Sequence, residues 1–251
     1  MKLSGVIITY NEARNIGRCL TSLQSVCDEI LVLDSFSNDA TQDICNSFGV
    51  RFEQHPFEGH IQQKNEALKR ATHPWILSLD ADEALTPELQ QAILALKALS
   101  PTKGAFRFKR LTNYCGTWIR HSGWYPDVKL RMASKEDVLW GGMNPHDQLI
   151  PKEGLSIEQL DGDLLHYSYY TKEDHFRQID YFSKIAAAEL FARKVRCNLV
   201  KLYLKVIAQF IKSLLLKKGF LDGKAGWLIA KRSAFATWQK YTILRQLWLN
   251  G

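Results

Sequence analysis

The chain has 251 residues, of which 46% are hydrophobic and 24% are charged, and its net charge is +7. This composition excludes a disordered chain, and the length suits one α/β domain with an appendage. The five cysteines are odd in number and show no Cys-x-x-Cys spacing, so a reducing compartment fits best. The apolar run at the N-terminus is too short for a signal peptide, and we therefore expect a cytosolic protein.

Positive charge is concentrated near the C-terminus. Residues 193–251 contain 13 Lys or Arg and a single acid, Asp222, whereas residues 1–192 contain 20 basic and 25 acidic side chains. The tail therefore carries a charge of +12, and the preceding part carries −5. Such segregation predicts that the tail meets an anionic partner, either nucleic acid or the cytoplasmic leaflet of a membrane.

Strand and helix patterns alternate over the first 80 residues. Apolar, β-rich runs predict strands at 3–10, 29–33, 50–54 and 75–79. The segments between them predict helices at 12–26, 39–48 and 61–71. This alternation indicates a parallel sheet with helices on both faces.

The pattern changes after a helix expected at 87–99. Phe106 and Phe108 alternate with basic residues, and another short strand is predicted at 129–132, so we expect antiparallel additions to the sheet. The irregular segment 113–127 is rich in aromatic, Gly and polar residues, which favours a loop over a site. From residue 172 onward the pattern is almost wholly helical, which predicts a division into an α/β domain at 1–170 and a helical region at 171–251.

Two acidic residues end the strand Trp-Ile-Leu-Ser-Leu-Asp-Ala-Asp-Glu at positions 75–83. Ligands of open α/β sheets bind at the carboxyl ends of the strands, which is where Asp80 and Asp82 are expected. Such a pair can hold Mg²⁺ or Mn²⁺ through oxygen, and the ion would neutralise a diphosphate. The alternative is a solvated turn, with Thr86 and Pro87 beginning the next helix.

Polar residues also follow the first two strands, in Thr9-Tyr-Asn-Glu12 and Asp34-Ser-Phe-Ser-Asn-Asp39. Tyr10 could stack on a base, and Asp34 could accept hydrogen bonds from a base or a ribose. Lys64 begins the helix before the acidic strand, where it could help to hold an anion or could lie on a solvated helix face. Neither the dinucleotide-binding nor the P-loop glycine motif is present.

Three segments together resemble the family 2 glycosyltransferases with a GT-A fold: Ile-Ile-Thr-Tyr-Asn-Glu, Leu-Val-Leu-Asp-Ser-Phe-Ser-Asn-Asp-Ala-Thr and Leu-Ser-Leu-Asp-Ala-Asp-Glu. The resemblance implies a Rossmann-like mixed sheet with a C-terminal helical extension. It also implies that the uridine of a UDP-sugar contacts Thr9, Tyr10, Glu12 and Asp34. Within the family's Asp-x-Asp pair, Asp80 would lie nearer the ribose and Asp82 would contact the metal.

Inverting transfer needs a base that removes the proton of the acceptor hydroxyl. Asp147, at the position where similar enzymes carry an acid, is our candidate; a surface turn is the alternative. Glu83 is its rival, although it is expected to face the following helix. His166 could complete the metal coordination or be a structural histidine, and Arg131 could face the diphosphate, the acceptor or only solvent.

The segment Gly219-Phe-Leu-Asp-Gly-Lys-Ala-Gly226 resembles the WaaE/KdtX subgroup of bacterial lipopolysaccharide inner-core glucosyltransferases. That resemblance implies transfer of glucose from UDP-glucose to a heptose of the lipid A core, with inversion. Two other functions stay open. A sugar nucleotidyltransferase would be expected to have a Gly-rich loop after the first strand, and a non-enzymatic nucleic-acid binder would be expected to have a reading motif.

The segment 198–216 predicts an amphipathic helix, because Lys201, Lys205, Gln209 and Lys212 recur along one stripe of an apolar sequence. These lysines argue against a transmembrane span and favour a helix in the membrane interface, and three later tryptophans support this. We therefore expect peripheral binding to the cytoplasmic face of the inner membrane and no nucleic acid. Packing of the apolar face on the catalytic domain, or homo-oligomerisation, is the alternative.

Overall fold

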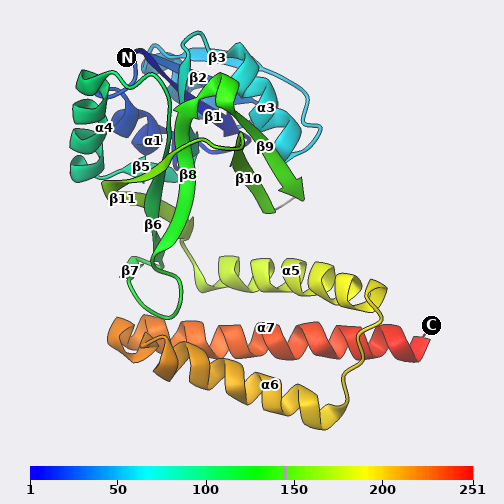
Figure 1. The fold of residues 1–251 in the computed structure, drawn as a ribbon. Helices are drawn as coiled ribbons and strands as arrows, with labels where there is room; N and C mark the ends of the chain where they lie inside the picture. Colours follow the sequence, from blue (N-terminus) through cyan, green and yellow to red (C-terminus); the bar gives the residue numbers. More distant parts are fainter. Residues whose placement is uncertain (144–145, 251) are drawn as a thin grey trace. The chain divides into compact units, whose positions relative to one another are not determined.

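The computed structural model describes residues 1–143 and 146–250, and it contains two compact units. One unit comprises residues 1–110 and 127–167, and the other comprises 111–126 and 168–251. The change at 167–168 lies beside the expected boundary at 170. Residues 111–126, however, group with the C-terminal helices (Figure 1).

A mixed sheet forms the first unit. Its parallel half has the strand order β3-β2-β1-β4, with the elements β1 (Leu3–Thr9), β2 (Glu29–Asp34), β3 (Arg51–Gln54) and β4 (Trp75–Asp80). The order continues from β4 as β8-β6-β11-β5, with the elements β8 (Asp127–Ser134), β6 (Ala105–Tyr114), β11 (Ile157–Tyr169) and β5 (Glu83–Leu85). Strand β8 is antiparallel to both β4 and β6, so it separates two strands that run the same way.

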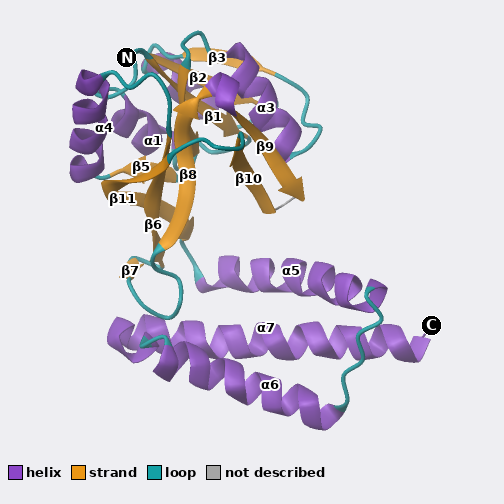
Figure 2. Ribbon diagram, in the orientation of Figure 1, coloured by secondary structure: helices purple, strands orange, loops and turns teal. Residues whose placement is uncertain are grey.

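Each face of the sheet has its own hydrophobic core, because alternate side chains of a strand point to opposite faces. On one face, Leu3 and Ile7 join residues of the helices α1 (Ile16–Leu23), α2 (Thr41–Ser47) and α4 (Pro87–Leu99). On the other face, Val6 joins residues of the helix α3 (His60–Arg70) and of the strands β9 (Val138–Met143) and β10 (His146–Pro151). The fold class expected from the sequence is confirmed, as Figure 2 shows by element type.

Two features of the sheet were not predicted. The antiparallel pair β9–β10 contains Gly141 and Gly142, and β11 contains several acids and Gly162, all residue types that are depleted in strands. Gly162 has a φ of +95°, and a Cβ built there would lie 2.4 Å from the backbone nitrogen of Leu89. Glycine therefore allows β11 to bend past the start of α4.

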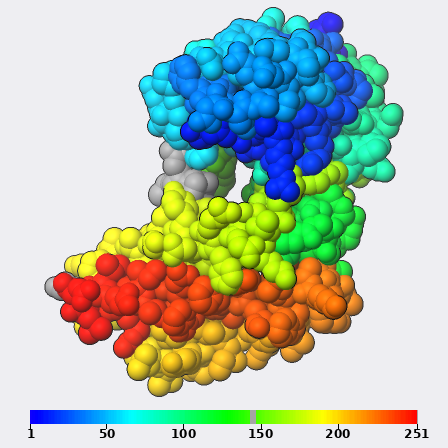
Figure 3. Space-filling model, turned by 180° about the vertical axis from the view of Figure 1, so that it is seen from behind, coloured from blue at the N-terminus to red at the C-terminus, as the bar shows by residue number. Residues whose placement is uncertain are grey.

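Three helices form most of the second unit: α5 (Lys172–Ala192), α6 (Leu199–Ile211) and α7 (Gly223–Asn250). Figure 3 shows α7, in red, between the other two. A π-helical turn at Lys212–Leu216 and a short turn at Gly219–Asp222 connect α6 to α7. A Cβ on Gly226 would lie 1.8 Å from the carbonyl oxygen of Gly219, so glycine at position 226 permits the close start of α7.

The segment 113–127, which we expected to be a loop over a site, hydrogen-bonds within this helical unit. It contains the end of β6 and the short strand β7 (Thr117–Ile119), which pairs with it. The buried carboxylate of Asp222 accepts hydrogen bonds from the backbone N–H groups of Arg120 and His121 and from the Ser122 hydroxyl. The one acid of the basic tail therefore fixes this segment.

Among the described residues, none of the helices is both long enough and apolar enough to cross a membrane.

Candidate active site

The loops that follow β1 and β2 are held to each other by hydrogen bonds. The backbone N–H of Asn11 donates to Ser37 Oγ at 2.8 Å, and the side chain of Asn11 accepts from the N–H of Asn38 at 2.9 Å. Asn11 and Phe36 adopt left-handed backbone conformations, with φ of 56° and 59°. These turns place both loops at the carboxyl edge of the parallel strands.

Asp34 connects the end of β1 to the loop after β2. It is fully buried, accepts a hydrogen bond from Thr9 Oγ1 at 2.9 Å, and accepts another from the N–H of Ser37 at 2.8 Å. Tyr10, in contrast, is exposed. The sequence-predicted contacts of Thr9, Tyr10 and Asp34 with uridine remain predictions, and any ligand bond to Asp34 would add to those that it already accepts.

Glu12 lies where several acids approach one another. Burial raises the pKa of Glu12, and the charges of Asp82, Asp39 and Asp80 raise it further, while a hydrogen bond from Asn15 opposes this. Mutual repulsion of this kind marks a place where a bound cation would be favoured. The carboxyl ends of β1 and β4 therefore form an acidic edge.

Asp80 lies between two cations. Its Oδ1 is 2.7 Å from Lys64 Nζ, and its Oδ2 is 2.8 Å from an amino group of Arg131. Burial alone would raise the pKa of Asp80, but the charges of Lys64 and Arg131 outweigh it and hold this pKa well below the usual range. Asp80 is therefore an ionised carboxylate whose charge is already compensated.

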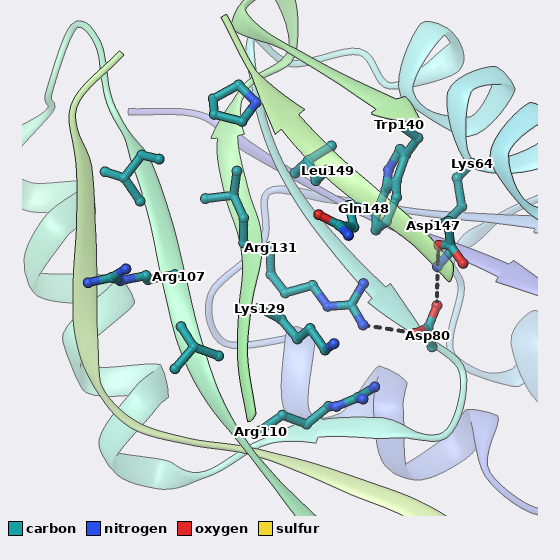
Figure 4. A pocket seen from close by; sticks show the side chains of 14 residues that line it. Lys64, Asp80, Arg107, Arg110, Lys129, Arg131, Trp140, Asp147, Gln148 and Leu149 are labelled. Carbon is teal, nitrogen blue, oxygen red and sulfur yellow. Dashed lines mark hydrogen bonds and ion pairs between the residues drawn. The ribbon is translucent and has the colours of Figure 1, made fainter. Parts of the chain in front are cut away.

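The same lysine also reaches the candidate base. Lys64 Nζ is 2.7 Å from Asp147 Oδ2, so Figure 4 shows a continuous row of ion pairs from Arg131 through Asp80 and Lys64 to Asp147. Its members come from four elements, namely β8, β4, α3 and β10. The structure thus brings four sequence-predicted site residues into contact, across 83 positions of sequence in the case of Lys64 and Asp147.

Glu83 is a buried support for this row. It accepts from the N–H of Asp80 at 3.0 Å, pairs with Arg131 at 2.7 Å and pairs with Arg110 at 3.3 Å. The expectation that Glu83 faces the following helix is therefore wrong. Burial would lower the pKa of Arg131, but Glu83 and Asp80 raise it. The roles of Glu83 and Arg110 were missed, although the closely spaced basic residues of β6 and β8 were a visible signal.

Asp82 and His166 form a second pair. Asp82 Oδ2 is 3.3 Å from His166 Nε2, and β11 is positioned for this by a hydrogen bond from the N–H of Tyr167 to the carbonyl of Asp82. Carboxylate oxygen and imidazole nitrogen are both ligands of divalent metals. In the described part of the chain no group of three or more His, Cys, Asp or Glu could hold a metal. Asp82 and His166 therefore offer one oxygen and one nitrogen donor at this edge.

The model of glycosyl transferase family 2 matches residues 4–145. The chain belongs to this family. Membership makes the protein a glycosyltransferase and agrees with the mixed sheet of the GT-A type. It also removes the nucleotidyltransferase and the non-enzymatic alternatives.

Relatives of this glycosyltransferase extend over nearly its whole length. An uncharacterized glycosyltransferase of Rickettsia typhi is 27% identical over 259 residues, covering 100% of this chain and 89% of the relative. The lipopolysaccharide core biosynthesis glycosyltransferase LpsC of Rhizobium meliloti is 25% identical and covers 97% of this chain and 94% of LpsC. Among solved structures, S. aureus TarS 1–349 in complex with UDP has a TM-score of 0.47 at 15% identity, covering 100% of this chain and 92% of that 1–349 chain.

Removing the shared cation should destabilise the glycosyltransferase. Lys64 is 6% exposed and compensates two carboxylates, so we expect Lys64→Met to lower the free energy of unfolding by about 2 kcal/mol. Urea denaturation at neutral pH measures this. Lys69→Met, on the same helix but 75% exposed, is the matched control and should change stability by less than about 0.5 kcal/mol. Equal stability of the two variants would contradict the assignment.

Proposed function

We propose that this glycosyltransferase is an inverting, metal-dependent enzyme that moves a hexose from a UDP-sugar onto the lipopolysaccharide inner core. The observation that carries the proposal is the row of ion pairs from Arg131 to Asp147. It connects the first carboxylate of the Asp-x-Asp pair to an acid that can act as a base. The row is therefore suited to join a donor site to an acceptor site.

The donor would occupy the carboxyl edge of β1, β2 and β4. Tyr10 is exposed and available to stack on uracil, while Thr9, Glu12 and the buried Asp34 shape the surrounding loops. Asp80 would lie at the ribose, and Lys64 would contact the diphosphate. Binding of an anionic diphosphate would give Lys64 a further partner beside the two carboxylates that it already contacts.

Asp82 and His166 are the residues that would hold Mg²⁺ or Mn²⁺, and their carboxylate and imidazole donors fit either ion. When bound, the ion supplies positive charge that stabilises the diphosphate as it leaves.

Transfer would be a single displacement. Asp147 removes the proton of the acceptor hydroxyl as its oxygen attacks the anomeric carbon from the face opposite the diphosphate. The bond between the anomeric carbon and the diphosphate oxygen breaks, and UDP leaves with that electron pair. Lys64 opposes the negative charge that develops on UDP. Attack from the opposite face inverts the configuration.

The acceptor is proposed from two similarities. LpsC is by its description a lipopolysaccharide core biosynthesis enzyme and aligns with 97% of this chain. The segment 219–226 resembles inner-core glucosyltransferases, and in this structure its last residue, Gly226, permits the close start of α7. We therefore propose glucose from UDP-glucose as the donor sugar and a heptose of the lipid A core as the acceptor.

Donor binding should depend on the metal. UDP and Mn²⁺ together should raise the melting temperature more than either alone, since a native-state ligand at about a hundred times its Kd stabilises by about 2.7 kcal/mol. Asp82→Asn should remove the part of this shift that requires Mn²⁺. Asp161→Asn replaces an exposed acid on the same strand as His166. This control variant should keep the Mn²⁺-dependent part of the shift. A full Mn²⁺-dependent shift in Asp82→Asn would argue against this metal site.

Loss of the base should separate binding from chemistry. Asp147→Asn should keep the Kd for UDP and lower the rate of glucose transfer to a lipid A-core acceptor by about a thousandfold. UDP release during turnover measures the rate. Asp137→Asn, an acid immediately before β9, should transfer at the normal rate. Retained turnover in Asp147→Asn would eliminate Asp147 as the base.

We further propose that the helical unit binds the cytoplasmic face of the inner membrane, where such an acceptor is anchored. Large apolar side chains of α6 and of the turns after it are exposed, namely Leu199, Val200, Tyr203, Leu204, Ile207, Ile211, Leu215 and Leu216. Lysines are interspersed among them, and the region 193–251 carries a charge of +12. An apolar face bordered by basic residues complements a bilayer that contains anionic lipids.

Acidic substitutions on this face should weaken membrane binding without unfolding the protein. The double substitution of Leu204→Glu with Ile207→Glu replaces exposed side chains, so the melting temperature should change little. Sedimentation with phosphatidylglycerol vesicles should show at least about tenfold weaker binding. Leu99→Glu, which also replaces an exposed leucine but at the end of α4, is the control. If the wild type bound purely zwitterionic vesicles as tightly as phosphatidylglycerol vesicles, the proposed attraction of the basic residues to anionic lipids would be contradicted.

A further inference from the structure

A pocket of about 680 Å³ lies beside Asp80, on the side of β4 away from β1 and β2. Strands β6 and β8 form one wall and the β9–β10 pair forms another (Figure 4). Asp147, the proposed base, lines this pocket, and a base must contact the acceptor hydroxyl. The proposed function therefore makes this pocket the acceptor site, and the present inference rests on that function.

Cations dominate the lining of the pocket. Five basic residues face two acids, and the lining cations are Lys64, Arg107, Arg110, Lys129 and Arg131. Two further carboxylates lie behind them: Glu83 is shared by Arg110 and Arg131, and Asp127 is shared by Arg110 and Lys129. Among the described residues Arg107 has no ion pair. The wall formed by β6 and β8 therefore presents positive charge that its acids do not fully compensate.

Among the residues that the structure describes, two buried N–H groups in this lining have no hydrogen-bond partner. They are Nε of Arg131, a residue that is 4% exposed, and Nε1 of Trp140, a residue that is 2% exposed. Buried donors are nearly always paired in folded proteins, so each unpaired one calls for an explanation. Two of them in one cationic pocket point to ligand oxygens as the missing acceptors.

We propose that the acceptor carries an oxyanion, either a phosphate or a carboxylate, which binds in this pocket close to the hydroxyl that is glycosylated. Arg131 and Lys129 hold the oxyanion, and Arg107 adds attraction from the same wall. Arg131 and Lys129 donate charge-assisted hydrogen bonds to the oxyanion, and such bonds are stronger than hydrogen bonds to a neutral sugar. The oxyanion thus selects among acceptors and sets the orientation of the sugar relative to Asp147.

The test compares three sugars that differ at one carbon: glucose, glucuronic acid and glucose 6-phosphate. The indole N–H resonance of Trp140, identified with Trp140→Phe in ¹⁵N-labelled protein, reports on the pocket. At least one anionic sugar should shift it with a Kd about tenfold lower than that of glucose. Tighter binding of the phosphate or of the carboxylate identifies which group the acceptor carries.

Variants show whether the named cations are responsible. The double substitution of Arg107→Gln with Lys129→Gln should weaken the anionic sugar about tenfold and leave glucose unchanged. Lys109→Gln lies on β6 but does not line the pocket, so it should bind like the wild type. Equal binding of anionic and neutral sugars, or no shift of Trp140 by any of the three, would overturn the inference.

A parallel titration with UDP and Mn²⁺ separates this inference from the proposed function. The anionic sugar and UDP should bind together, because they occupy different sides of Asp80. Displacement of the anionic sugar by UDP would overturn the inference, since the pocket would then belong to the donor diphosphate. Failure of UDP to bind the wild type would instead count against the proposed function, whatever the sugars show.

Discussion

The ammonium group of Lys64 is the interaction on which the site depends. Its Nζ lies 2.7 Å from Asp80 and 2.7 Å from Asp147, with the ring centre of Trp140 at 4.2 Å. A buried charge is tolerated only when it is paired, and this holds for the lysine and for both acids. One cation therefore fixes the positions of α3, β4 and the β9–β10 pair. On the other side of Asp80, the ion pairs of Arg131 with Asp80 and Glu83 fix β8 against β4 and β5.

The parallel half of the sheet was predictable because its signals are local. Strands β1, β2 and β4 are continuous apolar runs, and the helices between them show amphipathic spacing. Strand β11 was not predictable in this way. Its residues Glu158, Asp161 and Asp163 are poor strand formers, and it becomes a strand because β5 and β6 supply hydrogen-bonding partners from elsewhere in the chain.

In the site too, single residues could be predicted from their sequence context, whereas contacts between distant residues could not. Asp80, Asp82 and Asp147 could be proposed because each occupies a recognisable sequence context. Lys64, Arg131 and His166 were also candidates, but their pairing with these acids could not be predicted, because it depends on strand order. Arg131 reaches Asp80 and Glu83 only because β8 inserts beside β4. The segment 113–127 also depends on a distant residue, because it is fixed by Asp222, about 100 residues later.

The grouping of residues 111–126 with the C-terminal helices has a consequence for dissecting the protein. The helical unit is formed from two separate stretches of chain, so a stop codon near residue 168 would remove the helices and leave the first stretch without Asp222. Arg110 and Asp127 are register partners in the β6–β8 pair. A two-residue turn joining them would remove the inserted stretch, so that the sheet and the helices could be produced and studied as separate polypeptides.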